Sequence, residues 1–233
     1  MKKKLLLMII IIFLSLNIVL IFVSKKVYSH FDSKTMDDLE YSVVESSVEG
    51  DEYSKYMFSD FHSLKDLENK SDVIVKVKVI DKKYYQEDVL ANVEILKTYK
   101  GDCDEKITIA EPVKVNNYHP RASCMEGYVP MNEGEEYMLF LNKTDKDNMY
   151  IFVSDIYSHF KLNKTTKIMN FDDSKIHKMN DLKDFDYIYI YGTMGDSYDI
   201  LTKDDKMKTI DTKELTNTYR KIHAECYEKY AKN

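Results

Sequence analysis

The sequence predicts a mainly β protein with helices, in which five strands form a small closed barrel or sandwich. Three observations lead to this prediction. Residues 71–143 alternate apolar and polar side chains and are divided by turn residues, as short strands are. Near the C-terminal end, apolar residues repeat at helical spacing, which predicts an amphipathic helix. Near the N-terminus, 19 residues are almost entirely apolar, which predicts a transmembrane helix.

The membrane anchor is predicted over Leu5–Val23, a run interrupted only by Ser15 and Asn17. As a helix this run is about 28 Å long, close to the ~30 Å hydrocarbon core of a bilayer. A cleaved signal peptide and a buried core helix are the alternatives. Because no A-x-A cleavage site follows the run, we favour an uncleaved signal-anchor.

Lysines on the two sides of the apolar run predict its orientation. Lys2, Lys3 and Lys4 precede it, and Lys25 and Lys26 follow it. The positive-inside rule then predicts a single-pass protein of the cell membrane, with the N-terminus in the cytoplasm and the C-terminal domain outside. Without these five lysines the chain holds 29 Lys and Arg against 40 Asp and Glu. Such an acidic domain repels phosphate backbones, so we expect no nucleic-acid partner.

Four regions are expected along the chain. Residues 1–26 form the anchor, and residues 27–60 form an acidic stalk with room for a short helix or strand that touches the domain. Residues 61–165 form the barrel. Residues 166–233 form a β extension and a C-terminal helix packed on the barrel.

Within the barrel region, a short helix capped by Ser63 is expected to precede the strands. Turns are predicted at Gly101, at Asn132–Gly134 and at residues 145–148, and Pro112 is expected to end the third strand or to mark an edge. A further strand is expected at residues 159–162. The side chains predicted to point inward alternate along the strands: Val73, Val75, Val77, Val79, Ala91, Val93, Ile95, Ile107, Ile109, Tyr137, Leu139 and Leu141.

The C-terminal region is predicted to contain strands at residues 166–171, 187–191 and 198–202 and then a helix. Asp211 and Glu214 resemble a capping box at the start of this helix. Its apolar stripe is expected to dock on the barrel and consists of Leu215, Tyr219, Ile222, Cys226 and Tyr230.

Three motifs in the barrel region resemble those of the netrin-like domain. Ser71-Asp72-Val73-Ile74-Val75 resembles its opening strand, and Lys100-Gly101 resembles the turn after its second strand. Gly134 and Tyr137, followed by apolar residues, resemble its Gly-x-x-Tyr strand. This order is similar to that of the tissue inhibitors of metalloproteinases and of many bacterial surface proteins. The resemblance implies a five-stranded OB-type closed barrel.

The cysteines bear on both function and redox state. The metalloproteinase inhibitors bind zinc through a free N-terminal cysteine, whereas no cysteine precedes Cys103 here, so the resemblance does not imply protease inhibition. Cys103 and Cys124 flank the third strand and are predicted to form a disulfide outside the cell, or else to remain thiols. The third cysteine, Cys226, is expected to be a buried thiol. The chain has neither a C-x-x-C nor an H-E-x-x-H pattern, so we expect no metal site.

The loop between the third and fourth strands, residues 116–128, is the candidate ligand-binding edge of the barrel. It contains Tyr118, His119, Arg121 and Tyr128, and long loops between strands often carry function. An ordinary solvent-exposed loop is the alternative.

The predicted function is binding of a protein or cell-envelope component of unknown identity. No phosphate-binding glycine loop, dinucleotide fingerprint or nucleophile elbow occurs, so we expect neither a cofactor nor an enzyme. A hydrolase whose groups converge only in three dimensions is the alternative, with His119 or His159 beside a carboxylate and a hydroxyl. A structural spacer in a surface complex is a third interpretation.

Overall fold

The computed structural model describes Phe13, Ser15 and residues 36–44, 61–85, 87–116, 121–125, 127–171, 175, 177–190, 197–201 and 207–232. The chain divides into a small unit, Met1–Phe31, and a large unit, Asp32–Asn233. Among the described residues, no helix combines the length and the apolar character needed to cross a membrane. The predicted span, Leu5–Val23, lies outside the described residues except for Phe13 and Ser15.

A nine-stranded sheet forms the centre of the large unit, which confirms the prediction of a mainly β protein with helices. Its strands are β1 (Glu40–Val44), β2 (Val73–Tyr85), β3 (Asp88–Lys100), β4 (Lys106–Asn116), β5 (Arg121–Met125), β6 (Glu136–Lys143), β7 (Met149–Phe152), β8 (His159–Lys161) and β10 (His177–Lys178). Two small sheets pair β9 (Ile168–Phe171) with β11 (Tyr187–Ile190), and β12 (Ser197–Leu201) with β13 (Met207–Asp211).

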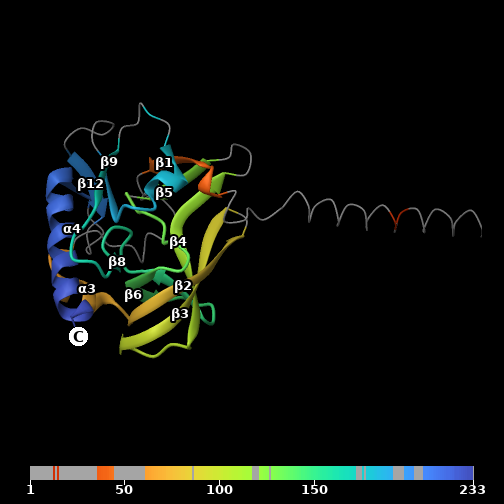
Figure 1. Ribbon diagram of the computed structural model, residues 1–233, viewed down its shortest axis with the longest axis horizontal. Coiled ribbons are helices and arrows are strands. Elements are labelled where there is room, and N and C mark those ends of the chain that lie inside the picture. The colour runs from red at the N-terminus through yellow and green to blue at the C-terminus, as the bar shows by residue number, and fades with distance from the viewer. Residues whose placement is uncertain are drawn as a thin grey trace, which may run out of the picture. The chain divides into compact units, whose positions relative to one another are not determined.

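Five of these strands form a ring of hydrogen-bonded neighbours, of which Figure 1 labels β2, β3, β4 and β6. The order around the ring is β2, β3, β4, β7, β6 and back to β2. All pairs are antiparallel except β4 with β7. β2 and β3 contain three register shifts, and such bulges bend long strands enough to curve around a ring.

The interior of the ring is filled by the side chains that the alternation predicted. Eleven of the twelve predicted residues are at most 2 % exposed. The twelfth, Ile95, is only partly buried, because β4 pairs with β3 no further than Glu94. Full burial of a Val, Ile or Leu side chain contributes about 1.5–3 kcal/mol, so this interior is a large share of the fold's stability.

Pro112 lies inside β4 and not at its end, which corrects the predicted strand boundary. β4 pairs with β3 on both sides of Pro112, at Glu111 and again at Lys114, and it pairs with β5 from Val113 onward. A register shift between Asp88 and Val89 of β3 lies opposite Pro112, so the proline stands at a bulge in the ladder of β3 and β4. A proline lacks the N–H that a ladder needs, so it is tolerated at such a bulge.

Two helices cover the outer face of β2 and β6. Helix α3 (Leu64–Lys70) is capped by Ser63, whose Oγ accepts a hydrogen bond from Asp66 N at 3.2 Å, as predicted. Helix α4 (Thr212–Cys226) runs along one side of the sheet, with α3 beside its C-terminal end (Figure 1). The Glu225 carboxylate of α4 accepts a hydrogen bond from Leu64 N at 2.9 Å, so α4 also caps α3.

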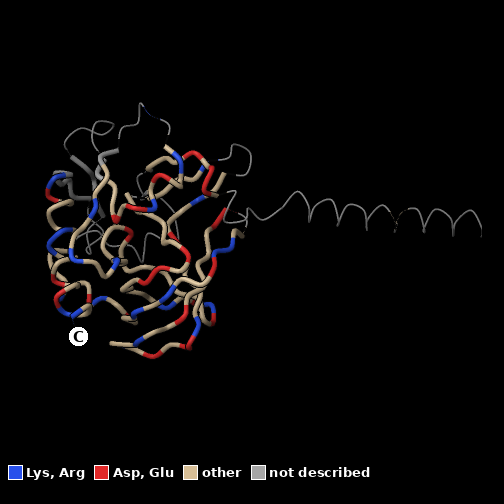
Figure 2. The backbone as a smooth tube through the Cα atoms, in the orientation of Figure 1, with Lys and Arg blue, Asp and Glu red and all other residues tan. Residues whose placement is uncertain are grey.

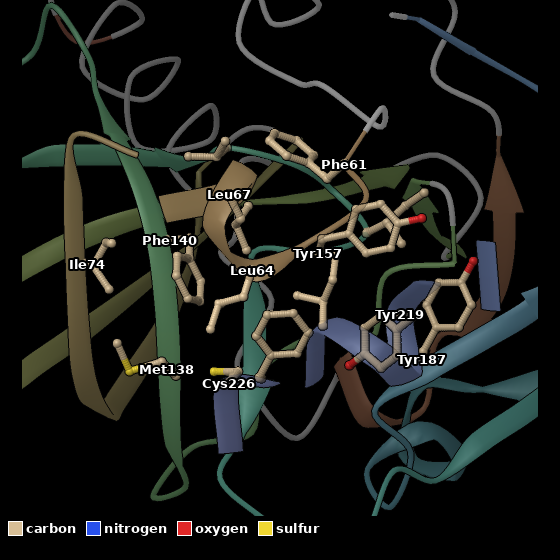
Figure 3. Close-up of a cluster of buried hydrophobic side chains, with 14 of the residues drawn as sticks. Phe61, Leu64, Leu67, Ile74, Met138, Phe140, Tyr157, Tyr187, Tyr219 and Cys226 are labelled. Atoms are coloured by element: carbon tan, nitrogen blue, oxygen red, sulfur yellow. The ribbon is translucent and has the colours of Figure 1, made fainter. Parts of the chain in front are cut away.

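The apolar stripe of α4 docks as predicted. Its five residues belong to one cluster of buried side chains together with residues of α3, β2 and β6. Figure 3 shows Leu67 of α3, Phe140 of β6 and Tyr219 and Cys226 of α4 pointing into this cluster. A π-helical turn, Tyr227–Ala231, continues α4 and brings Tyr230 into the same cluster.

Part of the predicted stalk belongs to the sheet. β1 pairs in parallel with β5 and antiparallel with β10. Met36 and Leu39, just before β1, are 2 % and 3 % exposed. β1 is thus a short strand of the predicted stalk region that touches the domain, which the prediction allowed, and residues 45–60 lie outside the described part of the chain.

Candidate functional site

Of the four predicted loop residues, the two that the structure describes do not lie on one surface. Arg121 begins β5 and pairs with Glu40 of β1 at 3.0 Å, with its side chain 56 % exposed. Tyr128 is instead 1 % exposed, and its side chain belongs to the core. Tyr118 and His119 lie outside the described residues.

The predicted Cys103–Cys124 bridge is not formed in this structure, where both residues are free thiols. Val113 of β4 pairs with Cys124, whereas Cys103 precedes Lys106 at the other end of β4. Seven residues of strand span about 23 Å, and a disulfide needs Cα atoms within about 7 Å. Cys226 is a buried thiol, as predicted.

A buried ion pair joins β2 and β4 at one end of the ring. Lys82 Nζ lies 2.9 Å from Glu111 Oε1, and the two side chains are 9 % and 0 % exposed. Glu111 Oε2 accepts hydrogen bonds from Tyr128 OH at 2.9 Å and from Met131 N at 3.1 Å. Burying an ion pair costs free energy that its mutual attraction often does not recover, so stability alone does not explain this pair.

Tyr128 completes the network around Glu111. Burial raises the pKa of Tyr128 well above its usual value, and the negative charge of Glu111 raises it further. The hydroxyl therefore stays protonated and donates its hydrogen to Glu111. In turn, Tyr41 OH donates to the Tyr128 carbonyl at 3.0 Å, which ties β1 to the same network.

His159 of β8 lies beside this network within a shell of aromatic rings. Its ring centroid is 4.4 Å from that of Tyr128 and 5.7 Å from that of Phe152. His159 Nε2 lies 2.9 Å from the Val129 carbonyl oxygen, so Nε2 carries the hydrogen. Burial lowers the pKa of His159 to about 3, and the ring is neutral at pH 7. The hydrolase site predicted for His159 would need an accessible carboxylate and hydroxyl beside it, and the contacts of this ring supply neither.

A pocket of about 550 Å³ opens next to the buried ion pair. Its described walls come from five segments: residues 36–37, β2, residues 130–135, residues 161–167 and residues 179–184. Lys82 belongs both to the pocket wall and to the ion pair, so it connects the pocket with the interior of the ring.

The walls of the pocket are held together by hydrogen bonds to one carbonyl group. The Lys183 oxygen accepts from Lys161 Nζ and from Asn132 Nδ2, each at 2.8 Å. The Lys183 ammonium pairs with Asp37 at 2.5 Å. These bonds connect four of the five segments before any ligand arrives, so the pocket is preformed.

Asp186 connects the pocket to helix α4. Its Oδ2 accepts from Lys167 N at 2.7 Å, and its backbone oxygen accepts from Tyr219 OH at 3.0 Å. Burial raises the pKa of this carboxyl group above its usual value. Lys167 is thereby fixed relative to the apolar cluster on which α4 rests.

Lysines and acidic residues are mixed around the pocket, and Figure 2 shows the same mixing along the described chain. The described lining contains four lysines and the four acids Asp37, Glu133, Glu135 and Asp184. Within the described residues, no group of three or more His, Cys, Asp and Glu side chains is arranged to hold a metal ion.

Sequence reasoning missed both members of the buried pair. The bulge at Ile80 changes the phase of β2, so that Lys82 pairs with the inward-facing Ala91. Alternation counted from Val73 places Lys82 on the outer face. Glu111 lies two residues after Ile109 and four after Ile107, so the alternation places its side chain on the inward face of β4. An acidic residue at an inward position could therefore have been recognised from the sequence.

No protein-family model matches this chain, and no curated protein matches it in sequence.

Proposed function

We propose that this chain is a membrane-anchored, extracytoplasmic binding module, and not an enzyme, whose OB-type barrel binds a protein or cell-envelope component. The observation that carries the proposal is the preformed polar pocket built against the buried Lys82–Glu111 pair. A pocket of this size matches the range of small-ligand sites, about 300–1,000 Å³. A polar network kept in a protein interior despite its cost is more common at functional sites than elsewhere.

The order of strands in the ring supports an OB-type barrel. An OB fold is a five-stranded Greek-key barrel, and here five strands close a ring in which only β4 and β7 run parallel. The helix α3 precedes the first strand of this ring, and β5 is inserted between its third and fourth strands.

Contacts between the motif residues support the netrin-like resemblance. Gly101 has a φ of +73°, and a Cβ there would lie 2.3 Å from the Asp72 carbonyl oxygen, so only glycine fits. Gly134 also has a positive φ, and Tyr137 OH accepts from Asn132 N at 2.9 Å across the same turn. Gly101 and Tyr137 thus each have a physical role at a turn between strands of the ring.

The proposal is tested by capture from membranes. The full chain, crosslinked in intact cells, is purified beside two variants: Lys161→Glu/Lys167→Glu, which reverses charges of the pocket wall, and Lys65→Glu/Lys146→Glu, which reverses exposed lysines outside the pocket. We expect the pocket variant to lose specific crosslinked partners that the control retains. Equal capture by both variants would contradict a role for the pocket.

The location is tested independently of the pocket. Protease added to intact cells should digest the domain from residue 36 onward, and a cytoplasmic marker protein should stay intact. Protection of the domain until the cells are lysed would overturn the proposed topology.

A further inference from the structure

The charges around the pocket limit what it can bind. The described lining carries four lysines and four acids, and Glu111 lies directly behind Lys82. Two of the lysines are already neutralised, Lys82 by Glu111 and Lys183 by Asp37. The pocket therefore has no excess of positive charge that would attract a phosphate group. Because its positive and negative charges are balanced, it does not favour any other multiply charged ligand either.

Charges of both signs remain available on the walls. In the described structure the Lys167 ammonium group and the Glu135 and Asp184 carboxylates line the pocket without an ion-pair partner. All three side chains are exposed, and the backbone of Lys167 is fixed by Asp186. A ligand that carries both an anion and a cation can pair with both kinds of group, whereas a neutral ligand leaves them unpaired.

Stacking contributes little in this pocket. Tyr84 is the one aromatic residue among the described lining residues, and it is 4 % exposed. A base or another flat ring gains affinity by stacking on an exposed aromatic face, and the described walls offer no such face. Charge pairing is thus the main source of affinity.

Resting on the proposed function, we infer that the pocket binds a short peptide with free ends, whose carboxylate pairs with Lys167 and whose ammonium group pairs with Glu135 or Asp184. Because all three side chains are exposed, each ion pair is screened by solvent, and each end should change the affinity about two- to fivefold.

The test uses trialanine and the purified full chain in a nonionic detergent. Isothermal titration calorimetry compares trialanine with its N-acetylated, C-amidated and doubly blocked forms. We expect each single block to weaken binding about two- to fivefold and the double block to weaken it by the product of the two factors. In the Lys167→Ala variant, the free and C-amidated peptides should bind equally, whereas Lys65→Ala, on the exposed side of α3, should keep the wild-type preference.

Two results would overturn the inference. The first is equal binding of the free and the doubly blocked peptide. The second is an absence of trialanine binding while crosslinked capture still depends on Lys161 and Lys167, which would leave the proposed function standing. If trialanine binds as expected but crosslinked capture does not change when Lys161 and Lys167 are replaced, the peptide site is supported. The proposal that the pocket binds an envelope partner is then wrong.

Discussion

Two buried regions of this protein differ in the kind of side chain that they contain. The cluster between the helices and the outer face of β2 and β6 contains apolar and aromatic side chains (Figure 3). The end of the ring next to the pocket contains Lys82, Glu111, Tyr128 and His159. Apolar burial stabilises a fold with little demand on geometry, whereas a buried polar network must be complete to be tolerated. The comparison suggests that the cluster holds the fold and that the network serves the pocket.

Removing one partner of the ion pair should produce the largest effect. Lys82→Met leaves Glu111 as an uncompensated buried charge, which costs about 3–5 kcal/mol of unfolding free energy. Urea denaturation followed by circular dichroism measures this loss. The double variant Lys82→Met/Glu111→Gln should regain most of it, because it removes the buried charge while the amide oxygen can still accept from Tyr128 OH and Met131 N.

The same pair of variants separates stability from function. If the network serves the pocket, the double variant should be stable and yet capture less partner than the wild type does. A double variant that remains as unstable as Lys82→Met would show that the pair is a structural requirement, and the contrast between the two regions would fail.

Leu67→Ala probes the apolar cluster. Leu67 of α3 is 0 % exposed, and truncation of a buried leucine to alanine costs about 2–5 kcal/mol. We expect a lower urea midpoint and unchanged trialanine affinity under conditions where the variant is folded. A reduced affinity in fully folded Leu67→Ala would show that the cluster and the pocket are coupled.

The difference between the regions also explains what the sequence could predict. Alternation along β2 and the stripe on α4 are local patterns that follow from strand and helix periodicity, and both are confirmed. The pairing of β1 with β5 joins residues about 80 positions apart, and no local pattern specifies it. The pocket depends on the bulge at Ile80 and on five separate segments, so it emerges only when the chain is folded.

Acid should weaken the polar end of the ring through His159. The pKa of His159 is about 3 in the folded protein and about 6.5 when unfolded. The unfolded chain therefore binds a proton that the folded chain does not, and stability falls as the pH falls from 6.5 towards 3. Linkage gives a loss of about 3 kcal/mol between pH 7 and pH 4. Unfolding free energies measured across this range should follow that slope.

His159→Gln provides the matched control for this slope. Glutamine can still donate to the Val129 carbonyl but does not titrate. The pH dependence of the variant should be smaller than that of the wild type, though not absent, because burial also lowers the pKa of His223. Identical slopes in the two proteins would mean that His159 is accessible to protons in the folded state.

The smallest effect is expected at Arg121, which tests whether the loop or the pocket recognises the partner. Its ion pair with Glu40 is half exposed, and such pairs contribute about 0.2–1 kcal/mol. Arg121→Ala should therefore lower the unfolding free energy by less than about 1 kcal/mol. If the pocket carries recognition, the Tyr118→Ala/Arg121→Ala variant should capture partner as the wild type does. If this variant loses capture although the pocket charges are intact, the partner is recognised by the predicted loop at residues 116–128 and not by the pocket.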